Sequence, residues 1–292
     1  MSSIYIKECL YGKYALFNNN LICNFMNTYG YFAKFEIEFF RTFLHENDNV
    51  IEIGSFIGTH AIPIKQMIKN GTLICFEPQQ LIFKLLCTNL MLNECHNVIT
   101  LPYGIGMDKY FTTSFDTNKS SEFSIINNIN TNNILTQQID CKTINHFSEI
   151  YENLSNIKLI KIDTEGMEIN VLNDLKEIIK KFNPFIFVEY NDETLIDMLI
   201  LFNELNYECY YFNTSTGTQY DISNKKFFFD IEHKIEASTE YIYKSGDFNI
   251  FAIPKTTILK PHLEKIILKK EMENKFSTAR VNSLDEVNNI WS

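Results

Sequence analysis

The stretch that decides the fold is residues 49–60, NVIEIGSFIGTH. It places a short apolar run before a loop with two glycines and the start of a helix. Such a strand–loop–helix unit is typical of α/β proteins with a parallel sheet. Glycine lets the backbone turn sharply and approach a ligand closely. Because free N–H groups of such a loop point above the sheet, we expect residues 54–58 to form part of a binding site.

Working outward, apolar runs alternate with helical patterns and extend this unit into a sheet. The alternation predicts a Rossmann-like α/β fold with a mostly parallel sheet. Polar insertions interrupt the pattern, and we expect the first of them to form hairpins beside the site. The expected strands are 49–53, 72–76, 97–101, 157–162, 184–188, 208–212 and 248–253, the expected helices are 79–93, 168–181 and 193–205, and the insertions are 104–145 and 213–246.

The chain divides into three segments. Residues 1–47 form an N-terminal extension, with an expected hairpin around Asn18–Asn20 and a helix at 33–45. Residues 48–255 carry the main domain. Residues 256–292 form a helical tail, in which Pro261 suits the first turn of a helix that runs to about Phe276. The tail is expected to pack on its own domain, and a homodimer contact through it is the alternative.

Composition narrows the classes of function. The 292 residues are 45% hydrophobic and carry a net charge of -10, so neither nucleic acid nor an anionic membrane is an expected partner. The seven cysteines include no CxxC pair, which argues against a structural zinc site. The chain begins without the pattern of a signal peptide and has no run of 18 apolar residues, so we expect a cytoplasmic enzyme without a membrane span.

Acidic residues at two strand ends indicate the ligand. Glu52 precedes Gly54-Ser55-Phe56-Ile57-Gly58, a loop that lacks the second glycine with which dinucleotide sites approach a pyrophosphate. S-adenosylmethionine (SAM) has no pyrophosphate, and its sulfonium and ammonium groups suit an acidic neighbour. Glu77 ends the next strand, before Pro78, where a carboxylate can accept two hydrogen bonds from a ribose diol. We therefore expect a SAM site formed by Glu52, Gly54, Ser55, Phe56, Gly58, Glu77 and Pro78.

These motifs, together with NLMLNE (89–94), LIKIDTEGMEINVL (159–172), PFIFVEYN (184–191) and FNIFAIP (248–254), resemble the FkbM-type SAM-dependent methyltransferases. The resemblance covers about residues 29–255, and the KIDTEGMEINVL block is its most specific part. It implies a class I methyltransferase sheet whose last strand is antiparallel, with helices on both faces. It also implies methylation of a hydroxyl on a sugar, a glycolipid or a polyketide-type metabolite. Ser55-Phe56 departs from the small residues and Asn that are common in this family.

The expected chemistry centres on Asp163, which directly follows a strand, with Glu165 and Glu189 at the same edge of the sheet. We expect Asp163 to orient or deprotonate the acceptor hydroxyl, with a pKa raised by burial and a like-charged neighbour. His60 and His146 are alternative bases. The favoured site holds no metal, although Asp163, Glu189 and Asn191 offer oxygen ligands suited to Mg²⁺.

The sequence therefore predicts a SAM-dependent O-methyltransferase that acts on a glycan or another small hydroxylated metabolite. Methylation of nitrogen and a non-catalytic SAM-binding protein are the alternatives. A nicotinamide-dependent oxidoreductase is a weaker one, because the glycine loop and the DTEG block both argue against it.

Overall fold

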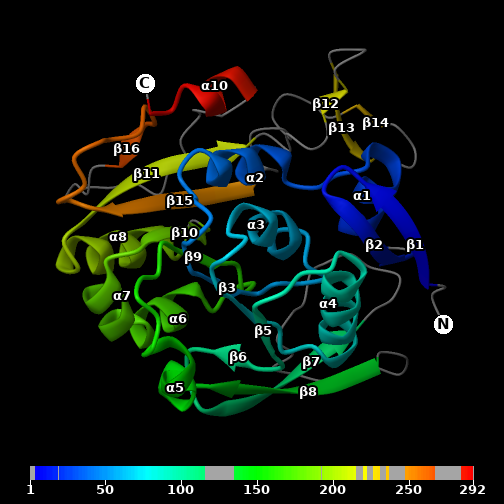
Figure 1. Cartoon of the computed structure of the whole chain (residues 1–292), viewed down its shortest axis with the longest axis horizontal. Helices are drawn as coiled ribbons and strands as arrows, with labels where there is room; N and C mark the ends of the chain where they lie inside the picture. The colour runs from blue at the N-terminus through cyan, green and yellow to red at the C-terminus, as the bar shows by residue number, and fades with distance from the viewer. Residues whose placement is uncertain are drawn as a thin grey trace.

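The computed structural model describes residues 4–18, 20–115, 135–191, 193–214, 220–221, 226–230, 235–236, 247–266 and 284–291. Its central feature is an eight-stranded sheet of order β16-β11-β15-β10-β9-β3-β4-β5 (Figure 1). The strands are β3 (Val50–Ile53), β4 (Leu73–Phe76), β5 (Val98–Leu101), β9 (Leu159–Ile162), β10 (Phe185–Glu189), β11 (Tyr207–Thr214), β15 (Asp247–Pro254) and β16 (Lys265–Ile266).

The directions of the strands confirm the predicted fold class. β3, β4, β5, β9 and β10 pair in parallel, whereas β15 is antiparallel to both β10 and β11. The chain leaves β3 through β4 and β5 on one side and returns through β9 and β10 on the other. The strand order therefore reverses between β3 and β9, and ligands of open α/β sheets bind beyond the carboxyl ends of the strands at such a point.

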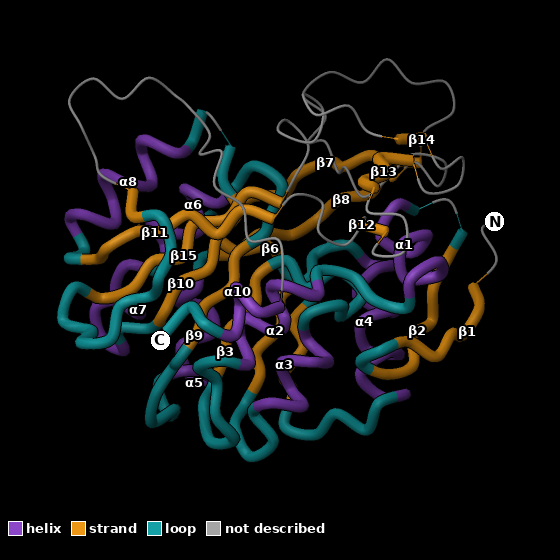
Figure 2. Tube along the Cα trace, turned by 90° about the horizontal axis from the view of Figure 1, so that it is seen from above, coloured by secondary structure: helices purple, strands orange, loops and turns teal. Residues whose placement is uncertain are grey.

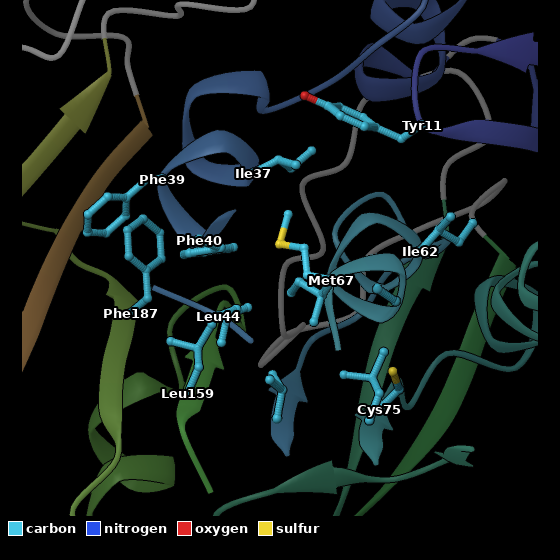
Figure 3. Packing of buried hydrophobic residues seen from close by; sticks show 14 of the residues in the cluster. Tyr11, Ile37, Phe39, Phe40, Leu44, Ile62, Met67, Cys75, Leu159 and Phe187 are labelled. Carbon is cyan, nitrogen blue, oxygen red and sulfur yellow. The ribbon is translucent and has the colours of Figure 1, made fainter. Parts of the chain in front are cut away.

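Helices cover both faces of the sheet, because the buried strands alternate their apolar side chains between two cores. The first core is rich in aromatic residues, and Figure 3 shows Phe39 and Phe40 pointing toward Phe187 of the sheet. The predicted helix 168–181 is divided at Leu175. One face carries α2 (Lys34–Arg41), α3 (Ala61–Met67), α4 (Gln80–Leu92) and α10 (Leu284–Asn288), and the other carries α5 (Ser148–Tyr151), α6 (Glu168–Asp174), α7 (Lys176–Phe182) and α8 (Leu195–Glu204).

The N-terminal segment forms a hairpin of β1 (Ile4–Cys9) and β2 (Gly12–Phe17), followed by α1 (Leu21–Tyr29). It lies beside α4, at the opposite end of the molecule from α8 (Figure 1). The predicted hairpin turn around Asn18–Asn20 is wrong, since the turn lies at residues 10–11. Asn20 instead caps α1, where its side chain accepts the Cys23 N–H at 3.0 Å. Asparagine favours both turns and helix N-caps, which explains the error.

The C-terminal segment also differs from its prediction. No helix begins at Pro261; residues 261–264 are irregular, and β16 pairs antiparallel with β11. The remainder of the predicted helix, residues 267–276, lies outside the described residues. The end of the chain packs on its own domain, because α10 contacts α2 (Figure 2). In addition, the Trp291 ring stacks on Phe39 with centroids 6.4 Å apart.

The first insertion forms a small sheet of order β6-β8-β7, from β6 (Gly104–Ile105), β7 (Lys109–Phe115) and β8 (Leu135–Lys142), and a 3-10 turn, η1 (Ile144–Phe147), follows it. The described parts of the second insertion form β12 (Tyr220–Asp221), β13 (Lys226–Asp230) and β14 (Ile235–Glu236). Among the helices built from described residues, none is both long and apolar enough to cross a membrane.

Candidate functional site

A pocket of about 900 Å³, partly open to solvent, lies beyond the carboxyl ends of β3, β4 and β9. Loops after these three strands form most of its wall, and the first insertion and α1 complete it. The lining residues are Ile22, Ile53, Gly54, Phe56, Glu77, Pro78, Gln79, Tyr103, Gly104, Ile105, Ile139, Cys141, Asp163, Thr164, Glu165 and Met167.

The glycine loop joins the two strand ends at the switch point. Gly54 has a φ of +86°, and a Cβ atom placed on it would lie 1.7 Å from the carbonyl oxygen of Asp163. Only glycine fits this position. Phe56 also has a positive φ, +48°, which is a strained conformation for a residue with a side chain. The loop therefore brings its backbone N–H groups close to the end of β9.

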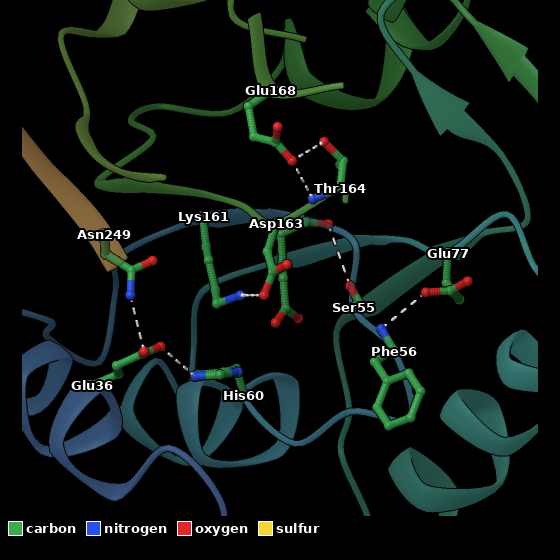
Figure 4. A network of polar contacts seen from close by, with 11 residues as sticks. Glu36, Ser55, Phe56, His60, Glu77, Lys161, Asp163, Thr164, Glu168 and Asn249 are labelled. Atoms are coloured by element: carbon green, nitrogen blue, oxygen red, sulfur yellow. Dashed lines mark hydrogen bonds and ion pairs between the residues drawn. The ribbon is translucent and has the colours of Figure 1, made fainter. Parts of the chain in front are cut away.

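Glu77 is the acid of the first wall and is 4% exposed. Its carboxylate accepts the N–H of Phe56 on one oxygen and the N–H of Gln79 on the other, each at 3.0 Å (Figure 4). Burial raises the pKa of Glu77 to about 7, although both hydrogen bonds oppose the shift. Each carboxylate oxygen keeps a lone pair that can accept a further hydrogen bond from a ligand.

Glu52, Ser55 and Gly58 do not line the pocket. The alternation of β3 turns Glu52 away from the pocket, toward the face that α2 and α3 cover, where it is 1% exposed. The Cys75 thiol lies 3.8 Å from its carboxylate. Burial raises the pKa of Glu52 to about 7, and Lys161 offsets this only in part. Glu52, Ser55 and Gly58, which were predicted to bind the cofactor, thus support the glycine loop without lining the pocket.

Asp163 is the acid of the second wall, and its side chain is 41% exposed. Its Oδ2 accepts a hydrogen bond from the Lys161 ammonium at 3.1 Å (Figure 4). Burial alone would raise the pKa of Asp163, but Lys161, His60 and a hydrogen bond with Glu189 hold it below its ordinary value. The prediction of a raised pKa is therefore wrong. The cause is Lys161, which directs its charge at this carboxyl group.

The other predicted acids take different places. Glu165 lines the pocket and is exposed, with a φ of +55°. Glu189, at the end of β10, does not line the pocket but hydrogen-bonds Asp163. The structure thus brings Asp163, Glu165 and Glu189 to one edge of the sheet, and places two of them on the pocket wall.

The alternative bases and Asn191 do not line the pocket. His60 is 5% exposed and its Nε2 lies 2.9 Å from Glu36, whereas His146 forms an exposed pair with Asp108 at 2.9 Å. The Asn191 side chain accepts the N–H of Thr194 at the start of α8. Within the described part of the chain, no group of three or more His, Cys, Asp or Glu residues is arranged to hold a metal ion.

Sequence reasoning missed part of the wall. Cys141 belongs to the insertion predicted beside the site, and Tyr103 directly precedes it, but nothing in their spacing identified them individually. Ile22 comes from α1, which was not predicted. Lys161 had a usable signal, because a lysine in the middle of a short apolar strand is rarely buried without a charged partner.

Comparison with known proteins agrees with the sequence motifs. The family model "Methyltransferase FkbM domain" matches residues 52–209, more than half of the chain. "Methyltransferase 1" of Beauveria bassiana is 22% identical over 173 residues, which cover 50% of this chain and 70% of that protein.

Two solved structures are similar in fold. A precorrin-6y C5,15-methyltransferase from Geobacter metallireducens aligns with a TM-score of 0.44 at 12% identity, over 75% of this chain and 87% of that one. A methyltransferase FkbM from Methylobacillus flagellatus aligns with a TM-score of 0.41 at 14% identity, over 73% of this chain and 47% of that one.

Proposed function

The chain belongs to the FkbM family of methyltransferases, and from this premise we propose that it transfers the methyl group of SAM to a hydroxyl group of a sugar, a glycan or another small metabolite. One observation carries the proposal: two carboxylates, Glu77 and Asp163, face the same pocket from the ends of two parallel strands. In this proposal one acid holds the nucleoside of the donor and the other binds the acceptor.

The residues of the first wall fit SAM. Glu77 is fixed by two backbone hydrogen bonds and has free lone pairs for a ribose diol. Pro78, Tyr103 and Ile105 give the same wall apolar and aromatic surfaces that suit a purine ring. When bound, SAM supplies an activated methyl group, so the protein has only to orient the acceptor and remove its proton.

We assign the second role to Asp163. Because Lys161 keeps its pKa low, the carboxylate is ionised at neutral pH and can accept the hydrogen bond of an acceptor hydroxyl. Glu165 stands next to it on the wall and is the second choice for this role. Glu189 holds the Asp163 carboxyl group by a hydrogen bond, which fits a positioning role.

The low pKa of Asp163 also supports a second candidate, transfer to nitrogen. A carboxylate with a depressed pKa is a weak base. A neutral amine needs less help from a base than an alcohol does, so an amine acceptor makes a smaller demand on this site. The same pocket would hold either acceptor.

Incubation with methyl-labelled SAM tests the proposal. The enzyme is mixed with panels of sugars, glycans, hydroxylated metabolites and amines, and the labelled products are identified by mass analysis. Labelled methyl ethers support the hydroxyl acceptor, and labelled amines replace it by the second candidate. If SAM binds, as calorimetry would show, but no panel member or cell extract is labelled, the non-catalytic alternative replaces the proposal. The Asp163→Asn variant serves as the control for protein-dependent transfer.

A further inference from the structure

Lys161 is a buried charge that lies next to the pocket without lining it. It lies in β9, whose four residues are all buried, and its side chain is 3% exposed. Leu159 packs into the core beneath α2 and α3, so the alternation of the strand turns Lys161 to that same face. Its ammonium group donates a hydrogen bond to Asp163 Oδ2 at 3.1 Å. Burying a charged lysine costs free energy, and this hydrogen bond offsets part of that cost.

Acidic residues from several elements surround this ammonium. Glu52 of β3 is in direct register with Lys161 of β9, so the two side chains lie side by side on one face of the sheet. Glu36 approaches from α2. Burial alone would lower the pKa of Lys161, but Asp163, Glu52 and Glu36 together raise it above its ordinary value. Lys161 therefore stays charged and forms its ion pair with Asp163, while Glu52 and Glu36 stabilise its charge electrostatically.

Glu36, the acid of this network that lies on α2, has neutral hydrogen-bond partners. Glu36 is 4% exposed, and its two oxygens contact His60 Nε2 at 2.9 Å and Asn249 Nδ2 at 3.1 Å (Figure 4). Burial raises the pKa of Glu36 to about 7, and burial also lowers the pKa of His60 well below its ordinary value. Asn249 of β15 is in register with Glu189 of β10. The network thus runs from α2 across the sheet to the strand ends at the pocket.

Packing alone does not explain this arrangement. Replacing a buried ion pair by apolar residues of similar size is often neutral or stabilising. Among the described acids of this network, which are Glu36, Glu52 and Asp163, Asp163 is the one that lines the pocket, and its side chain is 41% exposed. The fixed charge of Lys161 therefore acts on the one acid of the network that a ligand can reach.

We propose that Lys161 is a positioning residue, which holds the Asp163 carboxylate ionised and in a fixed orientation toward the acceptor. This inference rests on the proposed function for its catalytic consequence, but its structural part does not. Lys161 holds Oδ2, and a further hydrogen bond joins the Asp163 carboxyl group to Glu189, so two contacts fix its orientation at the pocket wall. Without the ammonium group, we expect Asp163 to take up a proton at a higher pH and to lose the contact that fixes Oδ2.

The direct test is the titration of Asp163 in the free protein, which needs no acceptor. The ¹³C signal of its carboxyl group is assigned by comparison with the Asp163→Asn variant. In the unmodified protein we expect no titration of this signal between about pH 4.5 and pH 8.5. In Lys161→Met we expect a midpoint inside this window, at least about one pH unit above its former position. A signal that does not move overturns the proposal.

Two further variants keep the test decisive if Lys161→Met does not fold. Lys161→Met/Glu52→Gln removes one charge of each sign, and we expect the same displaced midpoint in a folded protein. Lys161→Arg keeps the positive charge, so the Asp163 signal should stay outside the window. A displaced midpoint in Lys161→Arg as large as that in the double variant would contradict a role for the charge.

Lys65 offers a matched control. It is a second buried lysine, 5% exposed, but its ammonium group donates to the carbonyl oxygens of Ile68, Lys69 and Gly71 at the end of α3. Lys65→Met should lower stability without moving the Asp163 signal. Equal displacement in both lysine variants would mean that loosened packing, not the Lys161 charge, controls Asp163.

The kinetic test follows once an acceptor has been identified by labelling. In Lys161→Met/Glu52→Gln we expect kcat to fall at least about tenfold, and the acidic limb of the pH profile to move to higher pH. A merely structural role would not move that limb. If the Asp163 signal behaves as expected while no acceptor is ever labelled, the proposed function fails and the structural role of Lys161 stands. If transfer occurs but the Asp163 signal does not move in the Lys161 variants, the proposed function stands and the role of Lys161 fails.

Discussion

The two walls of the pocket hold their acids by opposite means. Glu77 is bound by backbone N–H groups from its own loop and from the glycine loop, and its pKa is raised to about 7 by burial. Asp163 is bound by a lysine side chain, and its pKa is lowered. Two carboxyl groups on one pocket are thus prepared for different tasks by their surroundings, as is common in enzymes.

This contrast supports the different roles that we propose for the two walls. Backbone amides fix a carboxylate without bringing a full charge, so Glu77 can form hydrogen bonds to a neutral diol. An ammonium group brings a full charge and keeps Asp163 ionised, which suits an interaction with a proton of the acceptor. The following predictions test this division of roles, beginning with the largest expected effect.

Replacing Asp163 by Asn should break the second wall alone. We expect turnover to fall by roughly 10²–10⁴-fold, because the ionised oxygen that accepts the proton is lost. The affinity for SAM, measured by calorimetry, should stay within about twofold, since Glu77 is untouched. Asp108→Asn removes an exposed pair with His146 and should leave turnover unchanged. Full turnover in Asp163→Asn would remove this residue from the mechanism.

Gly54→Ala should break the contact between the walls. The new Cβ would lie 1.7 Å from the carbonyl oxygen of Asp163, at a φ of +86°. Overpacking and backbone strain together should lower the free energy of unfolding by roughly 4 kcal/mol. SAM affinity and turnover should fall together. Gly30→Ala has a similar φ, +76°, but open space around its Cβ, so it should cost only about 1 kcal/mol of strain. Equal losses in the two variants in denaturant titrations would refute the steric explanation.

Stability should depend on pH through the acids with raised pKa values. Glu52 has an ordinary pKa of 4.5 and a folded value of about 7, so the folded protein binds more protons than the unfolded chain between these values. Stability should therefore decrease as pH rises from 4.5 to about 7, by up to roughly 3 kcal/mol for this group. Glu52→Gln should flatten the curve measured by denaturant unfolding. Glu46→Gln, at an exposed position, should leave the curve unchanged. If stability falls as steeply with pH in Glu52→Gln as in the unmodified protein, Glu52 is not the source of the pH dependence.

Sequence reasoning was most successful where local pattern determines structure. The strands at 50–53, 73–76 and 159–162 were predictable, because apolar runs and glycine positions encode them. The antiparallel direction of β15 was implied only by the family resemblance. Gly54, Glu77 and Asp163 were placed correctly on one pocket by their positions at strand ends.

Long-range contacts were not predictable in this way. The pKa of Asp163 depends on which face Lys161 occupies and on Glu36, a residue 127 positions earlier than Asp163 in the chain. Likewise β16 forms only because β11 offers an edge with which residues 265–266 can pair. By contrast, Glu77 is held by residues within about one βα unit of the chain, so its place could be predicted from local pattern.

Glu77→Gln should have the smallest effect and the clearest signature. Glutamine keeps one acceptor oxygen but turns an amide NH₂ toward one of the two backbone donors, Phe56 or Gln79. We expect SAM binding to weaken by about tenfold, or about 1.4 kcal/mol, with little change in kcat. Because the pKa of Glu77 is about 7, SAM binding to the unmodified protein should tighten as pH rises through that value, as the carboxylate forms. The variant should lose this pH dependence, while the exposed Glu46→Gln should keep it. If calorimetry finds the same pH dependence in Glu77→Gln, another group must hold the nucleoside and the proposed contrast between the walls is wrong.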